Sequence, residues 1–347
     1  MVQENSTHQH RLYIDGEEVL HKTEGSLSFN GNNQLNSLSV QISNPDLQNQ
    51  SLNLKPVKFY LDNKDSVPLF SGIIRDFVPS PGGISIKCVD VRGWISGNNG
   101  YAVTLTDKNN YDGYSISAFL HSLITDKVNI KKTLIGLDKL NSISPPLKEG
   151  FIYNLRTSGP IYDVATSLIT NVMDVDTDFM NPLGFSFDLI EEHDVSHLVI
   201  KKDKLLTETP SIIYSYTDGL ISCKYKNRSP ANTAVYDGGE FTYTNALDGK
   251  RVISIQGGNI EEEEISRAEI RNTAIKQVLL ENQTKNEITI QVSHGHYIGL
   301  GSIVRLEVPE EDIKGNHRVV SKNITFGNAM TCTLKLGKKP PQLSQYL

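Results

Sequence analysis

Cysteine is scarce in this chain, and its few cysteines stand far apart. Cys88, Cys223 and Cys332 are the only three among 347 residues, and no CxxC pair is present. This spacing excludes a disulfide framework and a cysteine zinc site. It is typical of a protein that is made in a reducing cytoplasm.

Long apolar runs are also missing. The sequence has no stretch of about 18 apolar residues, the minimum for a helix that spans a bilayer. The N-terminal segment MVQENSTHQHRLYIDG lacks the apolar core of a signal peptide. We therefore expect no stable membrane insertion and no secretion by the signal-peptide route.

An excess of positive charge is missing as well. The chain carries 34 lysine and arginine residues against 40 aspartate and glutamate residues, with a formal net charge of -6. A general nucleic-acid binder is usually basic, so neither DNA nor RNA is expected as the principal partner. The remaining composition, 38% hydrophobic and 21% charged, is that of a globular protein, and the length allows two or three domains.

Residues 1–105 have the pattern of short strands separated by turns. The segment 12–14 leads into Asp15-Gly16, which is the signal for a type I′ hairpin turn. Further strands are expected at 26–29, 38–42, 57–61, 70–74 and 84–91. Strands spaced by turn signals at roughly 8–12 residues favour a sandwich or a barrel.

Residues 106–205 change in character. The segment SISAFLHSLI (115–124) has apolar residues at helical spacing, with Ser115 as the expected N-cap. A second helix is expected from about Ile161 to Val172, after a proline that the first helical turn tolerates. Two alternating segments, 184–189 and 197–201, predict strands. This part is therefore predicted to be a compact α+β domain inserted between β-rich halves.

Residues 206–347 return to a β pattern. One helix is expected at about 261–282, where Glu261 to Glu264 complement the helix dipole. Strands are expected at 211–216, 220–225, 233–236, 251–256, 288–292, 303–308, 317–320 and 329–336. The predicted fold class is mainly β with an α+β insertion.

One segment has the beginning of a calcium loop. Asp174, Asp176 and Asp178 have the right spacing, but an EF-hand needs Gly at the sixth position and Glu at the twelfth. Phe179 and Phe185 occupy those positions. We interpret the segment as a solvated acidic turn after a helix.

Two histidine pairs have spacings that can bind zinc. His193 and His197 stand four apart and His294 and His296 two apart, which suits one helix face and one strand face respectively. However, HExxH is absent, residues 193–197 have the pattern of a turn between strands, and the second pair lies in a glycine-containing loop. We interpret all four as surface or capping histidines.

The sequence lacks the common motifs of catalysis and nucleotide binding. It has no GxSxG elbow and no GxGxxG in a strand–turn–helix context. A Walker A match ending at Gly337-Lys338 fails, because Cys332 replaces its first glycine and Lys339 its serine or threonine. The position of Glu261 to Glu264 at a helix start explains these acids without chemistry. We therefore predict no catalytic, cofactor-binding or metal residue, although glycosidase carboxylates are placed by the fold and leave no local motif.

Strand residues of this chain are rich in groups that suit assembly. Tyrosine occurs 14 times against one tryptophan, and Asn, Ser and Thr are frequent in the expected strands. Such strands suit edge pairing or packing against neighbours, and they equally suit the faces of an ordinary sandwich.

Two stretches of the chain resemble the hub proteins of phage baseplates. The first comprises SFNGNNQLNSLSVQISNP (28–45), LKPVKFYL (54–61), LFSGIIRDF (69–77) and ISIKCVDV (84–91). The second is GLGSIVRLEVPEEDIKGNHRVVSKNITFGNAMTCTLKLGKK (299–339), which is similar to the closing unit of that family. The SRAEIRN segment (266–272) also fits. The family includes hubs of the Mu and T-even type and the hub part of type VI secretion spikes.

This resemblance implies a structural protein with two barrels similar to the tail-tube fold. They would comprise residues 1–105 and 206–347, with the smaller domain 106–205 between them. Three copies would form a homotrimer whose six barrels make a pseudo-sixfold ring between the sixfold tail tube and the threefold central spike. Family function resides in interfaces, so no active site or cofactor is implied.

The same resemblance implies the partners and location of the chain. They are further copies of itself, the tail tube protein, a central spike protein on a separate chain, the tape measure protein and other baseplate proteins. Genome DNA would meet the chain only in transit through the lumen. The protein would be assembled in the host cytoplasm and reside in the virion, at the tail baseplate.

Two alternatives remain open at this point. One is a hub-like tail-tip protein of a long non-contractile tail, because the sequence does not distinguish contractile from non-contractile tails. The other is a glycan-binding or glycan-degrading β-protein, which predicts that aromatic and carboxylate residues converge in one cleft. The single tryptophan counts against a carbohydrate platform, although tyrosines can take its place.

Overall fold

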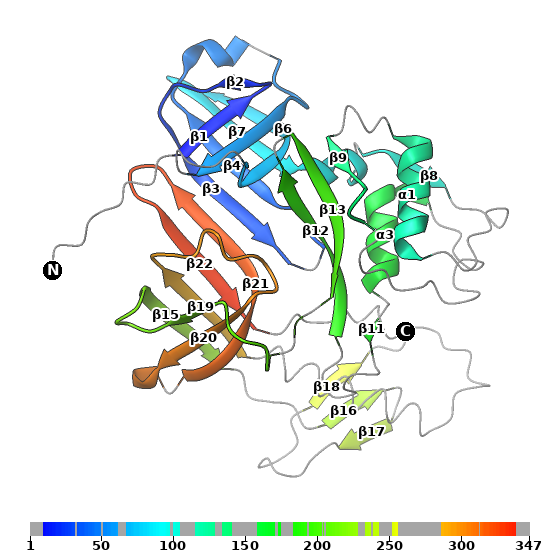
Figure 1. Ribbon diagram of the computed structural model, residues 1–347, viewed down its shortest axis with the longest axis vertical. Helices are drawn as coiled ribbons and strands as arrows, with labels where there is room; N and C mark the ends of the chain where they lie inside the picture. Colours follow the sequence, from blue (N-terminus) through cyan, green and yellow to red (C-terminus); the bar gives the residue numbers. More distant parts are fainter. Residues whose placement is uncertain are drawn as a thin grey trace. The chain divides into compact units, whose positions relative to one another are not determined.

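The chain divides into two compact units (Figure 1). In the computed structural model the first unit comprises residues 1–172, 185–203 and 321–332, and the second comprises residues 173–184, 204–320 and 333–347. The structure describes residues 10–31, 33–49, 51–61, 67–97, 100–104, 115–128, 134–140, 158–170, 173–174, 183–192, 194–202, 204, 206–227, 233–236, 239–242, 252–255, 286–311 and 313–337. Among them, no helix is long and apolar enough to cross a membrane.

The first unit begins with an antiparallel sheet. Its inward and outward side chains alternate as the sequence predicts, most regularly in β4 and β5. Asp15 and Gly16 both have positive φ, 55° and 84°, as the predicted type I′ turn between β1 and β2 requires. The strands are β1 (His10–Ile14), β2 (Glu17–Glu18), β3 (Thr23–Asn30), β4 (Ser37–Ile42), β5 (Pro56–Leu61), β6 (Phe70–Ser80) and β7 (Gly83–Asp90), with the 3-10 helices η1 (Pro45–Asn49) and η2 (Val91–Ile95).

Side chains close this sheet on itself. The strand order is β21–β3–β4–β7–β6–β5–β1–β2, where residues 321–326 of β21 (Ile313–Phe326) pair with β3. At the seam the ring centroids of Phe59 and Phe326 lie 4.6 Å apart, and those of His10 and Phe326 lie 4.8 Å apart. His10 Nε2 is also 2.7 Å from Thr23 Oγ1. The beginning of β1 therefore contacts both β3 and β21, which makes the sheet barrel-like.

Because His10 is partly buried at this seam, we expect it to contribute to the pH dependence of the protein's stability. Burial lowers the pKa of His10, so the unfolded chain binds its proton more readily than the folded chain does. Wild type should therefore lose more free energy of unfolding between about pH 7 and about pH 5 than the His10→Gln variant does. Urea titrations at both pH values measure this difference. Equal losses in the two proteins would contradict the prediction.

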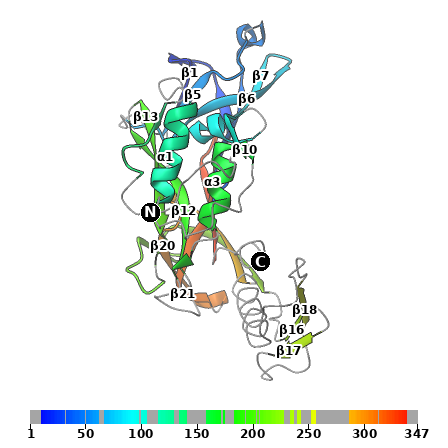
Figure 2. The same ribbon diagram turned by 90° about the vertical axis from the view of Figure 1, so that its right-hand side faces the viewer.

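The middle part of the chain packs two helices against a hairpin. Helices α1 (Ile116–Lys127) and α3 (Ile161–Thr170) lie side by side (Figure 2). Ser115 caps α1 as predicted, because its side chain accepts a hydrogen bond from the amide of Ala118. The neighbouring strands are β8 (Ala102–Thr104), β9 (Ile135–Gly136), β10 (Ser158–Pro160), β12 (Leu183–Glu192) and β13 (Val195–Lys202).

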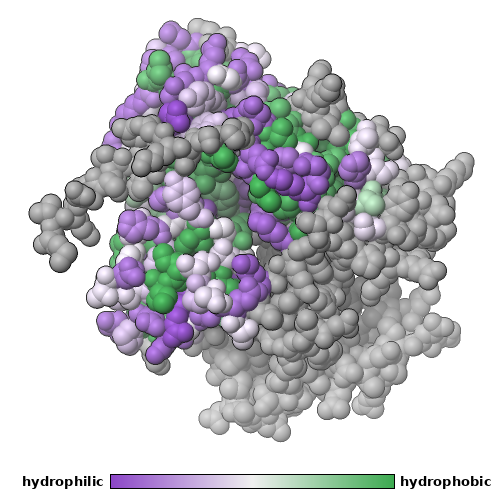
Figure 3. Space-filling view, in the orientation of Figure 1, coloured by the Kyte–Doolittle hydropathy of each residue, from purple (hydrophilic) through white to green (hydrophobic). Residues whose placement is uncertain are grey.

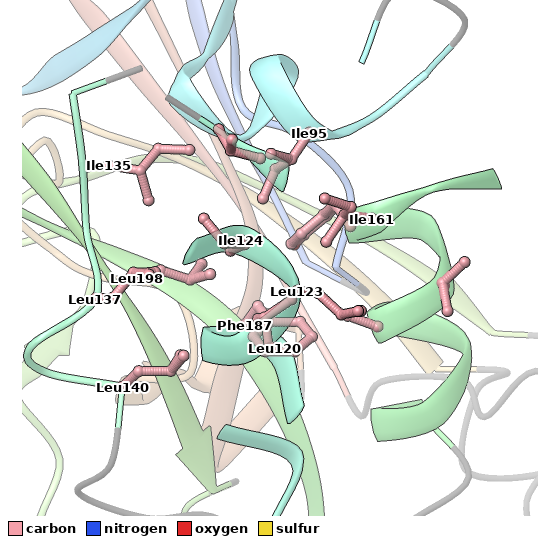
Figure 4. Packing of buried hydrophobic residues seen from close by; sticks show 14 of the residues in the cluster. Ile95, Leu120, Leu123, Ile124, Ile135, Leu137, Leu140, Ile161, Phe187 and Leu198 are labelled. Carbon is pink, nitrogen blue, oxygen red and sulfur yellow. The ribbon is translucent and has the colours of Figure 1, made fainter. Parts of the chain in front are cut away.

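A single apolar cluster holds this part together (Figure 4). It combines Phe119, Leu120 and Ile124 of α1 with residues of α3, β12 and β13, all almost completely buried. Val91 and Ile95 belong to the same cluster, although they directly follow the last strand of the opening sheet. The helices are thus anchored to the opening sheet through η2.

The second unit contains a further set of paired strands. Residues 313–318 of β21 pair with β20, and β14 runs parallel to β20 on its other side. The strand order continues as β15–β19–β22–β21, where β21 and β22 have residues in both units. The strands are β14 (Ile212–Tyr214), β15 (Leu220–Asn227), β19 (Asn286–Val292), β20 (Ile303–Val308) and β22 (Thr331–Leu336), and the 3-10 helix η3 (Pro309–Glu311) joins β20 to β21. A separate sheet has the order β17–β16–β18 and consists of β16 (Thr233–Tyr236), β17 (Gly239–Thr242) and β18 (Val252–Ile255).

The mainly β fold class is confirmed. The helix expected at 261–282 lies outside the described residues. Asp174 belongs to the short strand β11 (Met173–Asp174), so our interpretation of this residue as part of an acidic turn is wrong, because it pairs with Leu183. The division at 1–105, 106–205 and 206–347 stays a proposal.

Candidate functional site

The histidines singled out in the sequence have structural surroundings. His197 lies in β13, in agreement with the strand expected at 197–201 and not with a turn at 193–197, because its segment pairs with β12. Its Nδ1 is 2.6 Å from Asp138 Oδ1 and its Nε2 is 3.1 Å from Glu192 Oε2. His294 and His296 lie in the loop after β19, as expected, and His296 is buried against the Tyr297 ring. His193 lies outside the described residues.

Among the described residues, the other candidates form no site. Cys88, Cys223 and Cys332 are free and buried. Asp176, Asp178 and the Glu261 to Glu264 run lie outside the described residues. In the part of the chain that the structure describes, no three metal-binding side chains come together.

The most developed polar group in the first unit is a buried ion pair. Arg92 Nη2 and Nε lie 2.6 Å from Asp90 Oδ2 and 3.0 Å from Asp90 Oδ1, which is a bidentate arrangement. Arg92 Nη1 donates to the Tyr162 hydroxyl of α3 over 2.8 Å, and Nη2 donates to the carbonyl of Gln34 over 3.2 Å. The amide of Asn36 donates to Asp90 over 2.6 Å. All three ionisable side chains are at most 2% exposed.

The electrostatics of this group explain how a charge is tolerated there. Burial alone would lower the pKa of Arg92, but the charge of Asp90 outweighs it and the pKa is raised. Burial raises the pKa of Tyr162 as well, so its hydroxyl stays a neutral partner. Arg92 thereby links the sheet to helix α3: it forms an ion pair with Asp90 and donates a hydrogen bond to Tyr162. This arrangement indicates a fixed junction and not a reactive centre.

The second unit has four partly exposed apolar side chains close together in sequence. Ile213, Tyr216, Ile221 and Tyr225, which we call the 213–225 surface, are all between 42% and 52% exposed. They flank the turn in which the Leu220 amide donates to the Ser215 carbonyl. Figure 3 shows hydrophobic residues gathered on the face of this unit where β15 and β19 lie. Tyrosine is enriched on surfaces that another protein covers.

Sequence reasoning found the strands of this surface but not the surface itself. The pairing of β15 with β19 shifts in register between Leu220 and Ser222, which is a β-bulge. Leu220 and Cys223 therefore point inward while Ile221 points to solvent. A bulge leaves no strict sequence signal, so alternation alone assigns these side chains to the wrong faces.

Solved structures with this fold include tail proteins. A tail protein of Neisseria meningitidis aligns with 98% of this chain and 99% of its own, with a TM-score of 0.63 and 14% identity. A prophage tail protein from Shewanella oneidensis aligns with 97% of this chain and 98% of its own, with a TM-score of 0.62 and 10% identity. A type VI secretion component of Escherichia coli, described as structurally similar to T4 bacteriophage tail proteins, covers 95% of this chain and 79% of its own, with a TM-score of 0.55 and 10% identity.

These likenesses extend over nearly the whole chain and concern the fold. They confirm, at that level, the resemblance to phage tail and baseplate proteins that the segments 28–91 and 299–339 predict. No protein-family model matches the chain, and no curated protein matches it.

Proposed function

We propose that this protein is a structural baseplate hub of a phage tail or of a related contractile injection system. Three copies form a ring with pseudo-sixfold symmetry, which connects the sixfold tail tube to a threefold central spike. The tube protein, the spike, the tape measure protein and other baseplate proteins are its partners, and it has no catalytic role. Its location is the tail baseplate of the virion, after assembly in the host cytoplasm.

The observation that carries this proposal is the full-length likeness in fold to tail proteins at TM-scores of 0.63 and 0.62. The buried Arg92–Asp90 junction supports it, since an element that transmits force between tube and spike gains from a rigid connection. The net charge of -6 is in keeping with a lumen that does not retain the phosphates of passing DNA.

The 213–225 surface is the part of the chain that we assign to ring formation. A closed ring of identical chains uses a heterologous contact, in which one surface meets a different surface of the next copy. Each such contact should bury roughly 1,000 Å² or more. A second copy is therefore the proposed occupant of this surface.

The mass of the purified protein tests the hub proposal. We expect light scattering to give three chain masses of 38.6 kDa, alone or after addition of the candidate spike protein. Negative-stain class averages should then show a ring with six similar lobes around a hole. A chain that stays monomeric with the spike present, and forms no lobed ring, would contradict the proposal.

A further inference from the structure

The outer face of the opening sheet carries an arginine that is stacked on tyrosine. Arg11 of β1 is the cross-strand partner of Tyr60 of β5, and its guanidinium carbon lies 5.5 Å from the centre of the Tyr60 ring. The ring of Tyr13 meets that of Tyr60 edge-on, with the centroids 5.4 Å apart. All three side chains are partly buried, between inward-facing neighbours that are fully buried. We call these three residues the Arg11 platform.

The guanidinium of the platform has no carboxylate partner among the described residues. Its Nη1 donates a long hydrogen bond of 3.4 Å to the Tyr13 hydroxyl, and its buried Nε has no acceptor in the described part of the chain. The neighbouring charges have other partners. Glu18 accepts from the Tyr13 hydroxyl over 3.3 Å, and Lys58, opposite Tyr13, is paired with Asp194. Because a guanidinium binds a carboxylate best, the platform is suited to an acidic group from outside the chain.

The second unit has an exposed acidic corner beside the 213–225 surface. The 3-10 helix η3 contains Glu310 and Glu311, and none of its residues is buried. The hydroxyl of Tyr216, a member of the 213–225 surface, donates to Glu311 over 3.0 Å. Within the described ranges neither glutamate has a cationic partner, whereas Glu307 is paired with Arg305. Glu310 and Glu311, which we call the acidic corner, therefore extend the 213–225 surface with unpaired negative charge.

We propose that the Arg11 platform of one copy binds the acidic corner of the next copy. This inference rests on the proposed hub function, in which identical chains join through a heterologous contact. Such a contact brings a surface of one copy against a different surface of its neighbour, and the two surfaces named here have opposite charge. The platform also has the composition of an interface centre, where arginine and tyrosine are enriched.

The contact would fix the direction in which the chains join. Each chain carries one platform and one acidic corner, so the same pairing is made at every junction of a closed ring. A platform facing a platform places like charges together, which charge repulsion disfavours. The 213–225 surface supplies apolar area, and the charged pair beside it selects the correct neighbour.

Charge reversal in the full-length protein tests the proposal. Arg11→Glu should weaken ring association at least about tenfold, because it places like charges opposite each other. Glu310→Arg combined with Glu311→Arg should weaken it as well. A chain with all three changes has complementary charges again at every junction and should regain most of the association. Sedimentation velocity across a concentration series, with the candidate spike protein present, measures each variant.

Lys22→Glu is the matched control for these variants. The Lys22 side chain is 60% exposed on the first unit and lies outside the platform, so reversing its charge should leave the ring unchanged. A second measurement does not depend on charge reversal. Chains with Arg11→Cys and Glu310→Cys together should be linked to one another by a short bismaleimide, whereas chains with either change alone should stay single. The native cysteines are buried and do not compete for the reagent.

The outcomes separate this inference from the hub proposal. Wild-type assembly of both charge-reversed variants, a combined variant that associates no better than they do, or a double-cysteine protein that is not linked would overturn the inference and leave the hub proposal standing. A wild-type protein that forms no ring with its spike would overturn both.

Discussion

Replacing Arg92 with methionine is expected to destabilise the first unit by about 3–5 kcal/mol, because it leaves the buried Asp90 carboxylate without its counter-charge. Asp90 is only 1% exposed, so water cannot take over the role of the guanidinium. Urea unfolding followed by tryptophan fluorescence measures the effect. The single tryptophan, Trp94, lies in the same 3-10 helix and packs against the apolar cluster.

A matched set of variants assigns this loss to the buried charge. Arg305→Met removes the exposed partner of Glu307 and should cost less than about 1 kcal/mol. Tyr162→Phe removes one hydrogen bond to Arg92 and should cost about 1–2 kcal/mol. The double variant Arg92→Met with Asp90→Asn should regain part of the loss, since no buried charge remains unpaired. An Arg92→Met protein as stable as the Arg305→Met control would show that the junction is not stabilising.

The junction illustrates what the sequence could and could not predict. Local rules predicted the strand that ends at Asp90, the cap at Ser115 and the helix that begins at Ile161. The contact between Arg92 and Tyr162 joins residues 70 positions apart, and it depends on how the helix packs. A single arginine after a strand carries no signal of such a partner, so neither the ion pair nor its burial followed from the pattern.

Strand β21 shows a second reason why the structure differs from what the sequence predicts. Only 317–320 was expected as a strand, yet β21 extends over fourteen residues. Residues 313–318 pair with β20 and residues 321–326 pair with β3, so the strand changes partners along its length. Its burial does not alternate strictly across this change, which removes the period-2 signal that identifies strands.

The fold class survives such local errors because it depends on many segments at once. Turn signals and alternation recur throughout 1–105 and 286–336, and each strand there adds independent support. The 213–225 surface depends instead on single residues whose exposure arises from the register shift between Leu220 and Ser222.

The 213–225 surface gives the second large prediction, which rests on the proposed hub function. A variant with Ile221→Glu and Tyr225→Glu should lose ring assembly, with the association weakened at least about thirtyfold, because buried tyrosines and their neighbours dominate interface energies. Its monomer should lose only about 1–2 kcal/mol of unfolding free energy, since Ile221 and Tyr225 are 52% and 42% exposed. Sedimentation velocity across a concentration series measures the fractions of monomer and of assembled ring.

Leu20→Glu is the matched control, because Leu20 is 84% exposed on the first unit and lies outside this surface. A single exposed leucine is ordinary on a protein surface, so this variant should assemble like wild type. If the Ile221 and Tyr225 variant still forms the wild-type ring, this surface does not mediate assembly, although the hub proposal stands. If wild type itself forms no ring with its spike, the hub proposal fails. These two results are distinct because the first concerns only the variant, whereas the second appears before any residue is changed.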